Sequence, residues 1–552
     1  MSDLKDLITS LSITAAGLAR SPAGRRQLVK LIGIQVKLGL RSKPVQRYLQ
    51  LARYMARLSV RGALLYVVVK YFVYRLFLHP ANKLPGPAPG LFPFLGHFRQ
   101  ILAKDAGVVH REWANKYGPV YRYFAGGNNP SIMVAEPELV KQILTNNEFD
   151  FVKPPETKHF LTSVLGQGLL VAEGQAHRHQ RKMLNPAFGP SVLHDMVPLM
   201  IRPTQQLIRQ WHQLLRQGPA DLVVSQGLGH LMLEIIGIAG FGTEFDAIRD
   251  PQHHPITRAY TDLFSGDKPM VAMLSMLFPW VGKVPFPRIK QVRRDVDLLR
   301  QSTQDLVLQA AKRTDIHEKN DLLALMIRQV DDDSGRKLSV KELQDQCLTF
   351  LAAGHETTSV AVSWCLHTLA HHPEIQDALR KEVSQVLSNM TPDNDQVASF
   401  PTFEDINHLS LLNNVCKETL RFTPPVPLTH RIAIKDFELQ GNVYPKGTRV
   451  VISPMVSHFD KRQWGDDVDE FKPSRWDKAP ANIISPYVYL PFLAGGRQCI
   501  GYRFALLEFK VVLALLIKNF KFTTTPGFQV RKGMQVSLRP LPNMTLHVES
   551  LF

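Results

Sequence analysis

The chain has 552 residues, with 66 Lys and Arg against 48 Asp and Glu, which gives a formal net charge of +18. A hydrophobic fraction of 45% and a charged fraction of 21% are typical of folded proteins and exclude a disordered or low-complexity chain. Four cysteines, none in a C-x-x-C pair, exclude a disulfide scaffold and argue against a structural zinc site.

The positive charge is concentrated at the N-terminus. Residues 1–80 carry 14 basic and two acidic residues, a net charge of +12, which leaves only +6 for the rest. Because nucleic-acid-binding proteins more often carry their excess on the folded domain, we expect no nucleic-acid partner. The basic residues flank an apolar run, Gly62–Leu78, whose 17 residues are near the lower limit for a membrane span and include Lys70 and Arg75.

Residues 1–83 are therefore predicted to form a basic extension that attaches the protein to a membrane, either by spanning it or by lying on its surface. An organelle presequence and a soluble helical extension are the alternatives. The next seven residues, 84–90, read LPGPAPG. Three prolines cannot continue a helix, so this segment is predicted to be a stiff hinge.

Residues 91–552 contain no comparable linker, repeat or charge run and are predicted to form one large body. Helical spacing extends over Lys341–His371, and Pro373 opens a second helix. Further helices are expected over His408–Phe422 and Arg503–Phe520, with short extended segments at 431–445 and 448–452. The predicted fold class is mainly α with small β-sheets.

The strongest chemical signal is the segment Phe492–Gly501, FLAGGRQCIG. Its glycines allow the backbone to turn tightly and approach a flat ligand. Cys499 comes just before an apolar helix, whose first N–H groups favour a metal-binding thiolate. Arg497 supplies a cation for an anionic group of a cofactor. A buried structural cysteine is the ordinary alternative, and the combination of glycines, arginine and cysteine at this spacing argues against it.

This segment resembles the haem-binding loop of cytochromes P450. Three further motifs follow the family order: Ala353–Thr358 (AGHETT) resembles the oxygen-activation motif, Glu418–Arg421 resembles Glu-x-x-Arg, and Phe471–Trp476 resembles the segment whose arginine completes a triad with that pair. The resemblance covers roughly residues 80–552. It implies the cytochrome P450 fold, with a long central helix over the haem.

The resemblance implies a haem b cofactor with the thiolate of Cys499 as axial iron ligand. Where this family often has a tryptophan, four residues before Arg181, the chain has His177, whose N–H can replace the indole donor. The implied cofactor-binding residues are Cys499, Arg497, Phe492, Arg431, Arg181 and His177.

Thr357 and Glu356 are the predicted catalytic residues. Within a helix, a threonine hydroxyl can bond the carbonyl three or four residues back, and the resemblance makes Thr357 the residue that directs a proton to oxygen. Glu356 is expected to relay protons from solvent. A packing threonine and an exposed helix carboxylate are the alternatives. Glu418, Arg421 and Arg475 are expected to be structural, and Ser474 stands where the family has a glutamate.

Only 53 residues follow Cys499, which is too few for a fused reductase domain. Electrons are therefore expected from a separate NADPH-dependent flavoprotein reductase, with cytochrome b5 as a second candidate donor. A lipophilic small molecule is the expected substrate. Its pocket is predicted to be lined by segments 350–358, 424–429 and 153–169, with an entrance at Val271–Val281.

These features predict a membrane-anchored haem-thiolate monooxygenase that inserts one atom of O2 into a lipophilic substrate. The expected location is the endoplasmic reticulum membrane, with the catalytic domain facing the cytoplasm. The alternatives are a haem-thiolate isomerase or dehydratase and a non-catalytic haem sensor or carrier. Neither needs a dioxygen proton relay, so the presence of Glu356 and Thr357 argues against both.

Overall fold

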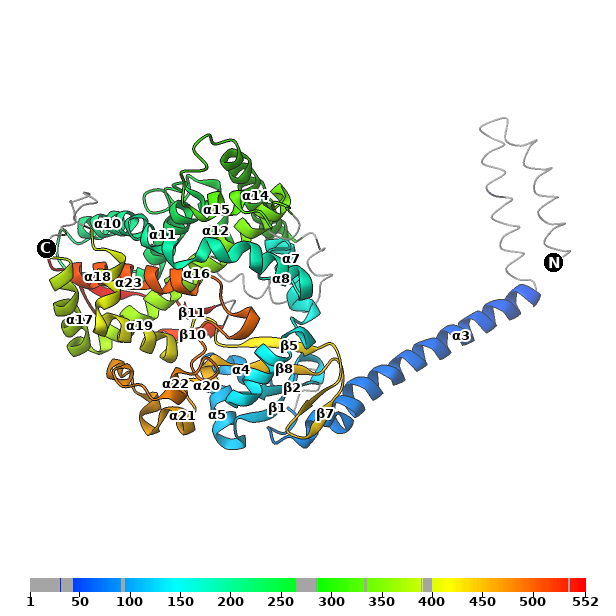
Figure 1. The fold of residues 1–552 in the computed structure, drawn as a ribbon. Coiled ribbons are helices and arrows are strands. Elements are labelled where there is room, and N and C mark those ends of the chain that lie inside the picture. The colour runs from blue at the N-terminus through cyan, green and yellow to red at the C-terminus, as the bar shows by residue number, and fades with distance from the viewer. Residues whose placement is uncertain are drawn as a thin grey trace, which may run out of the picture. The chain divides into compact units, whose positions relative to one another are not determined.

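The computed structural model describes residues 30, 43–90, 95–264, 284, 286–331, 335–388, 390, 400–534 and 537–552. The chain divides into two compact units, Met1–Leu78 and His79–Phe552. Figure 1 shows the ribbon of both units. The predicted substrate entrance, Val271–Val281, lies outside the described residues.

The described part of the first unit is one long helix, α3 (Lys43–Val68), which continues as the π-helix η1 (Val69–Leu78). Its apolar side chains are largely exposed: Leu64 is 60% and Leu65 is 64% exposed. Lys70 donates a hydrogen bond to the hydroxyl of Tyr66 at 2.9 Å. Among the described residues, one helical stretch, Gln50–Lys83, has the length and apolar composition needed to cross a membrane.

The second unit is mainly helical, which confirms the predicted fold class. Its α-helices are α4 (Phe98–Ala103), α5 (Val108–Tyr117), α6 (Pro137–Lys141), α7 (Pro155–Leu165), α8 (Gly174–Leu184), α9 (Pro190–His194), α10 (Val197–Leu214), α11 (Val224–Ile235), α12 (Pro255–Phe264), α14 (Pro287–Ala311), α15 (Leu322–Arg328), α16 (Val340–His371), α17 (Pro373–Val386), α18 (Phe403–His408), α19 (Ser410–Phe422), α20 (Pro454–Ser457), α21 (Lys461–Trp464), α22 (Ala481–Ile484) and α23 (Tyr502–Asn519). Short 3-10 or π-helical turns are η2 (Pro80–Lys83), η3 (Gly126–Asn128), η4 (Gln142–Asn146), η5 (Glu148–Asp150), η6 (Asn185–Phe188), η7 (Ile236–Gly240), η10 (Asp466–Asp469), η11 (Pro473–Trp476) and η12 (Gly495–Arg497).

The strands form small sheets. They are β1 (Val120–Ala125), β2 (Asn129–Val134), β3 (Phe151–Val152), β4 (Ala220–Leu222), β5 (Thr429–Ala433), β6 (Phe437–Leu439), β7 (Asn442–Tyr444), β8 (Arg449–Ile452), β9 (Phe520–Thr524), β10 (Arg531–Met534), β11 (Leu538–Leu541) and β12 (Leu546–Ser550). The largest sheet has the order β1-β2-β8-β5-β3, and only its β2–β8 pair is parallel. The smaller sheets have the orders β4-β12-β9, β10-β11 and β6-β7.

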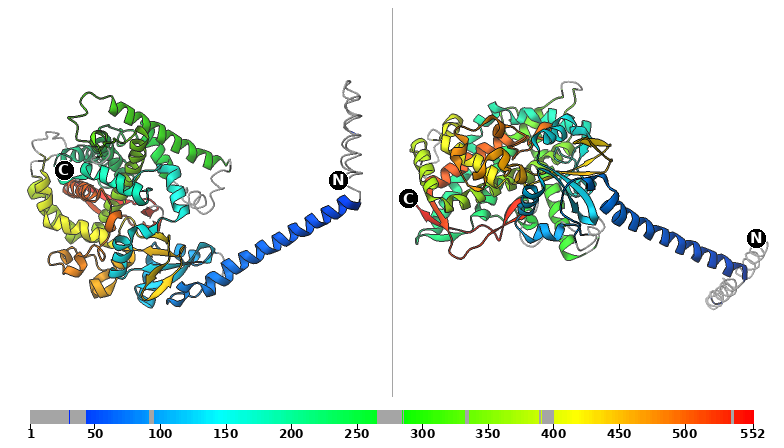
Figure 2. Two further views of the ribbon diagram at one scale, coloured as in Figure 1. Left: turned by 45° about the vertical axis from the view of Figure 1, so that its right-hand side comes forward. Right: turned by 90° about the horizontal axis from the view of Figure 1, so that it is seen from below.

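Helix α16 passes through the middle of the second unit (Figures 1 and 2). The sheet strands β1, β2 and β8 lie on one side of it, and α10, α11, α12, α14 and α15 lie on the other. A capping box fixes its start, because the Ser339 hydroxyl accepts from the Glu342 N–H while the Glu342 carboxylate accepts from the Ser339 N–H. It ends at His371, immediately before the turn that leads to Pro373. The central helix thus starts one residue before its predicted start and ends where predicted.

The Pro-rich segment 84–90 lies against β1. The Arg122 N–H donates to the Pro85 carbonyl at 2.9 Å, and its guanidinium donates to the Pro87 carbonyl. A Cβ on Gly86 would lie 2.0 Å from the Arg122 carbonyl oxygen, so only glycine permits this approach. The boundary between the two units follows Leu78. The division at residues 83 and 90 stays a prediction.

Candidate active site

The loop before α23 is closed by a backbone hydrogen bond: the Cys499 N–H donates to the Phe492 carbonyl at 2.9 Å. Gly495 has φ +69°, and a Cβ there would lie 2.1 Å from the Leu144 carbonyl oxygen, so both its backbone angle and its surroundings require glycine. The Gly496 N–H donates to the Glu148 carboxylate at 2.9 Å. These contacts hold the loop against η4 and η5 and fix the position of Cys499.

Cys499 lies inside the second unit, yet its side chain is exposed. Burial raises the pKa of its thiol, while the Gly501 N–H, at the helix start, and the Arg181 guanidinium act to lower it. The other three cysteines are buried. Cys499 is thus the one cysteine of the four that is open to contact with a ligand.

A cluster of cations surrounds one carboxylate next to this loop. Arg497 donates to the Ala172 carbonyl at 2.6 Å and pairs with Glu173. Lys153 also pairs with Glu173, at 3.3 Å. Arg431 extends from β5 and is 6% exposed. It lies close enough to Glu173 and Arg497 for their charges to act on its pKa. Glu148 also acts on the charge of Arg497, so three cations face two carboxylates and the cluster keeps an excess of positive charge.

The pKa values of the cluster reflect this excess. Burial, with Arg431 and Arg497 adding to it and Glu173 opposing it, lowers the pKa of Lys153 to about 8. Burial lowers the pKa of Arg431 to about 10, with the Arg497 charge acting in the same direction. Burial and the charges of Arg497, Lys153 and Arg181 lower the pKa of His177 to about 4, so its imidazole is neutral at pH 7.

Arg181, on α8, faces the cysteine loop. Its guanidinium donates to the Gln498 carbonyl and to the Asn185 side chain, the latter at 3.0 Å. Phe492 is partly buried and its ring lies 6.1 Å from that of Tyr502. The structure thus gathers Cys499, Arg497, Arg431, Arg181, His177 and Phe492 around one loop, although they come from α8, β5 and the loop before α23.

The middle of α16 has an exposed position among buried ones. Ala353 is exposed, although Leu351, His355 and Glu356 on the same helix are buried. The partly exposed Thr357 donates its hydroxyl proton to the Ala353 carbonyl at 2.8 Å, which is the bond to the fourth residue back that the sequence predicts. Because that bond uses the only hydroxyl proton of Thr357, its oxygen can still accept a hydrogen bond from another donor.

Glu356 is 3% exposed, so the interpretation of this residue as an exposed helix carboxylate is wrong. One of its oxygens accepts from the Ser537 hydroxyl at 2.7 Å and pairs with Arg539 at 3.1 Å. Arg539 keeps a side-chain exposure of 25%. The buried carboxylate is therefore joined, through two partners on the C-terminal strand region, to a group that reaches solvent.

Aromatic contacts connect the cysteine loop with α16. The Phe188 ring lies 5.3 Å from that of Phe350 on α16 and would be 3.5 Å from a Cβ on Gly501. The Thr358 hydroxyl of α16 lies close enough to Glu508 of α23 to act on the pKa of its carboxyl. The loop that holds Cys499 and the helix that holds Thr357 are thus parts of one packed region.

Glu508 is 1% exposed, and neither carboxyl oxygen has a hydrogen-bond partner within the described part of the chain. Burial raises its pKa to about 8, and the Thr358 hydroxyl only partly opposes this. The carboxyl is therefore protonated in the folded protein at neutral pH.

This burial predicts a pH-dependent stability. The unfolded chain ionises Glu508 near pH 4.5 and the folded chain near pH 8, so the folded state binds the extra proton between these values and stability falls as pH rises through this window. Glu508→Gln should remove that fall. The measurement is the thermal unfolding midpoint at both ends of the window, with the exposed Glu549→Gln as control. An equally steep fall in Glu508→Gln would contradict the prediction.

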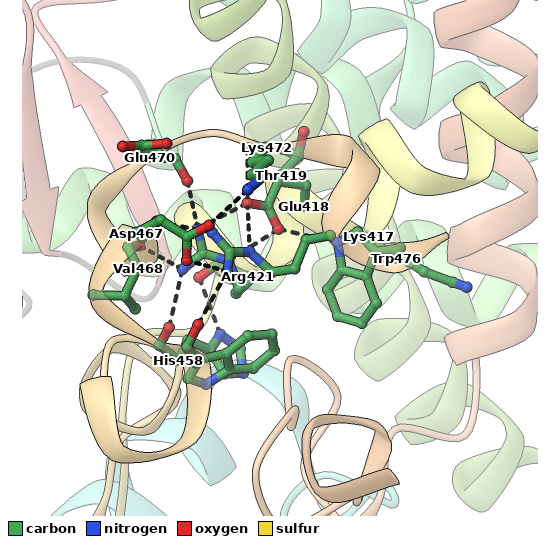
Figure 3. Close-up of polar contacts among 12 residues, drawn as sticks. Lys417, Glu418, Thr419, Arg421, His458, Asp467, Val468, Glu470, Lys472 and Trp476 are labelled. Atoms are coloured by element: carbon green, nitrogen blue, oxygen red, sulfur yellow. Dashed lines mark hydrogen bonds and ion pairs between the residues drawn. The ribbon is translucent and has the colours of Figure 1, made fainter. Parts of the chain in front are cut away.

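A second polar network surrounds the fully buried pair Glu418 and Arg421 (Figure 3). The guanidinium binds both carboxylate oxygens, at 2.8 and 2.9 Å, and donates to the carbonyls of His458, Val468 and Glu470. Arg475 contacts Glu418 at 3.4 Å and Asp467 at 2.7 Å. The chain has Ser474 in place of the family's glutamate, and the second carboxylate on Arg475 is that of Asp467.

The Cytochrome P450 family model matches residues 85–547. The chain belongs to the cytochrome P450 family. A curated relative, Cytochrome P450 monooxygenase 205 of Postia placenta, is 31% identical over 85% of this chain and 91% of its own length. Cytochrome P450 monooxygenase sphH of Aspergillus fumigatus is 32% identical, over 85% and 89%, and Cytochrome P450 3A16 of Mus musculus is 28% identical, over 89% and 97%.

Membership of the cytochrome P450 family implies a haem-thiolate centre, and the residues of this chain fit it. The exposed sulfur of Cys499 is a suitable iron ligand. The cations Lys153, Arg431 and Arg497 outnumber the carboxylates near them. Because buried cations are stabilised by anionic partners, this cluster suits the two carboxylates of a haem.

The sequence did not reveal the roles of three residues of this P450 site. Lys153 and Glu173 complete the cation cluster, but Lys153 is a single lysine in an extended segment, which carries no local signal. Arg539 reaches Glu356 from 183 residues further along the chain, so no periodicity predicts the pair.

Proposed function

We propose that this cytochrome P450 is a membrane-anchored haem-thiolate monooxygenase that inserts one oxygen atom from O2 into a lipophilic organic substrate. The observation that supports this best is the exposed Cys499 in its glycine-rich loop, next to cations that outnumber their carboxylates. Cys499 would ligate the iron of haem b, and Arg497, Arg431, Arg181 and His177, together with Lys153, would hold the propionates. Phe492 would contact the haem from the same loop. Haem with a thiolate ligand supplies the chemistry of O–O cleavage when bound.

Protons are proposed to reach the cavity along α16. The Glu356 carboxylate accepts from Ser537 and pairs with Arg539, whose side chain is 25% exposed. The guanidinium keeps its own protons, so the proton would come from solvent water beside this pair. The next residue, Thr357, has its own hydroxyl proton committed to the Ala353 carbonyl. Its oxygen can therefore accept and orient a water, which holds the proton donor at the cavity wall.

The substrate pocket is proposed to be lined by residues 350–358 of α16, by segment 424–429, and by segment 153–169, which contains α7. Support comes from contacts that hold the loop after α7 on α16: Asp345 accepts from the Gln167 N–H at 3.0 Å, and Gln346 accepts from the Leu169 N–H at 2.9 Å. Leu169 and Phe350 are buried apolar residues. An apolar wall of this kind suits a lipophilic substrate.

Electrons are proposed to come from NADPH through a separate flavoprotein reductase, with cytochrome b5 as a second donor. The apolar N-terminal helix is proposed to attach the enzyme to the endoplasmic reticulum membrane, with the catalytic unit facing the cytoplasm. Such a location places the site on the side where NADPH and its reductase operate.

Thr357→Ala should separate electron uptake from product formation. The variant should still consume NADPH with reductase present, but it should release more peroxide and form less oxygenated product per NADPH, because no hydroxyl orients the proton donor. Placement of an acid or base is typically worth about 10²–10⁴ in rate, so the loss should be large unless a water replaces the hydroxyl. The measurement is NADPH consumed, peroxide released and product formed.

Thr349→Ala is the matched control, because Thr349 makes the same bond to the fourth residue back, at 2.9 Å, on the same helix but is buried. Unchanged coupling in Thr357→Ala would remove Thr357 from the mechanism. Turnover by the wild type without reductase and O2 would instead favour an isomerase or dehydratase and overturn the monooxygenase proposal. Absence of any turnover would favour a haem sensor or carrier.

A further inference from the structure

The first part of α3 has two distinct faces. Arg47, Arg53, Arg57 and Arg61 are all exposed and are spaced by six, four and four residues. At about 100° per residue these four arginines fall within an arc of about 120° of the helix surface. Between Arg47 and Arg61, the other residues in this arc are Gln50 and Tyr54.

The remaining arc is apolar apart from one serine. It carries Leu51, Met55 and Leu58, which are 58%, 53% and 50% exposed, followed by Ala52, Ala56, Ser59 and Val60. A helix with an arginine face and an apolar face is suited to a membrane–water interface, where the apolar face enters the acyl boundary. The arginines then lie at the level of the lipid headgroups.

The charge of this region selects the kind of lipid. After Asp6 the next acidic residue in the chain is Asp105, so no carboxylate of the sequence near α3 neutralises the arginines. Anionic headgroups are the complementary partners, and guanidinium groups bind phosphate and carboxylate with two parallel hydrogen bonds. Zwitterionic headgroups carry no net charge and therefore attract the arginines less strongly.

We propose that α3 lies along the membrane surface and that its arginine face, Arg47, Arg53, Arg57 and Arg61, binds anionic phospholipid headgroups. The inference rests on the membrane attachment proposed above and adds the lipid class and the placement of the helix. It also gives the first half of α3 a role separate from the apolar run that follows.

The distribution of charge supports a surface placement. The 20 residues before Gly62 contain five basic residues, and the 20 residues after Leu78 contain one, Lys83. Basic flanks stay on the cytoplasmic side of a membrane. A span over 62–78 would then put the catalytic unit on the opposite side from the arginines, away from NADPH. A helix that lies on the cytoplasmic leaflet leaves the arginines and the catalytic unit on the same side of the membrane. That leaflet carries the anionic lipids.

The first experiment measures binding of the purified full chain to vesicles of phosphatidylcholine alone and of phosphatidylcholine with phosphatidylserine. The wild type should prefer the anionic vesicles, and salt should weaken the preference. The variant with all four arginines replaced by glutamine should bind anionic vesicles about 10²–10³-fold less tightly, at about 1 kcal/mol per basic residue. The variant with four lysines in their place should keep most of the preference.

Equal binding of the wild type to both kinds of vesicle, or equal binding of the wild type and the glutamine variant to anionic vesicles, would overturn the lipid assignment. The glutamine variant in detergent should keep the ferrous–CO spectrum and turnover of the wild type. A chain with anionic preference but without turnover would therefore contradict the proposed function alone, and the reverse result would contradict this inference alone.

The second experiment tests the placement of the helix in sealed microsomes from cells that make the full chain with an N-terminal epitope. Added protease should digest both the epitope and the catalytic unit, because both lie on the cytoplasmic side. Protection of one of the two would show that the chain crosses the membrane between them and would overturn the surface placement.

Discussion

Cys499→Ser should lose the red-shifted Soret band that a thiolate-ligated haem gives in its ferrous CO complex. A serine hydroxyl has nearly the same size but cannot supply an anionic sulfur donor, so the ligand field at the iron changes even where the fold survives. The loop does not depend on the sulfur, because its closure comes from the Cys499 N–H on the Phe492 carbonyl and from the Gly495 and Gly496 contacts with η4 and η5. The far-ultraviolet circular dichroism should therefore stay that of the wild type.

Cys347→Ala is the control for this variant, since Cys347 is buried on α16 and burial keeps its thiol protonated. The control should keep the red-shifted band. A Cys499→Ser chain with an unchanged band would show that another group ligates the haem, and the assignment of the whole site would fail with it.

The second large effect is expected at Arg421, which should be required for a folded, haem-loaded chain. Arg421→Ala removes all the hydrogen bonds of a guanidinium that is fully buried and leaves the Glu418 carboxylate in the interior without its main partner. Removing one partner of a buried ion pair typically lowers the free energy of unfolding by about 3–5 kcal/mol. Since the net stability of a folded protein is only about 5–15 kcal/mol, most of the margin would be lost.

The measurement for Arg421→Ala is the thermal unfolding midpoint and the fraction of purified chain that carries haem. Arg462→Ala is the control, because the Arg462 side chain is 50% exposed although it also pairs with carboxylates. Surface pairs typically contribute about 0–1 kcal/mol, so the control should unfold close to the wild type. An Arg421→Ala chain as stable as the control would remove the structural role of this network.

The sequence allowed the helices and the cysteine loop to be predicted because their signals are local. The start and end of α16 depend on a capping serine and a following proline, and both are visible within a few residues. The glycines of the loop are required by contacts with η4 and η5, which the sequence does not reveal, but their spacing from Cys499 is itself a pattern.

Partners that are distant in the chain could not be predicted in this way. The state of Glu356 depends on Ser537 and Arg539, which reach it only because the C-terminal strands fold back against α16. The same holds for Lys153 and Arg431, which come together with Arg497 at one carboxylate from three separate segments. Their chemistry is a property of the packed unit rather than of any local motif.

The most direct test of the monooxygenase proposal is an isotope measurement. Cells that make the full chain, and cells that make Cys499→Ser, are grown under ¹⁸O₂, and their lipophilic extracts are compared by mass spectrometry. We predict metabolites that appear only with the wild-type chain and carry one ¹⁸O atom more than their precursors. Wild-type-dependent metabolites without the label, or labelled metabolites formed equally by the Cys499→Ser chain, would contradict the proposal.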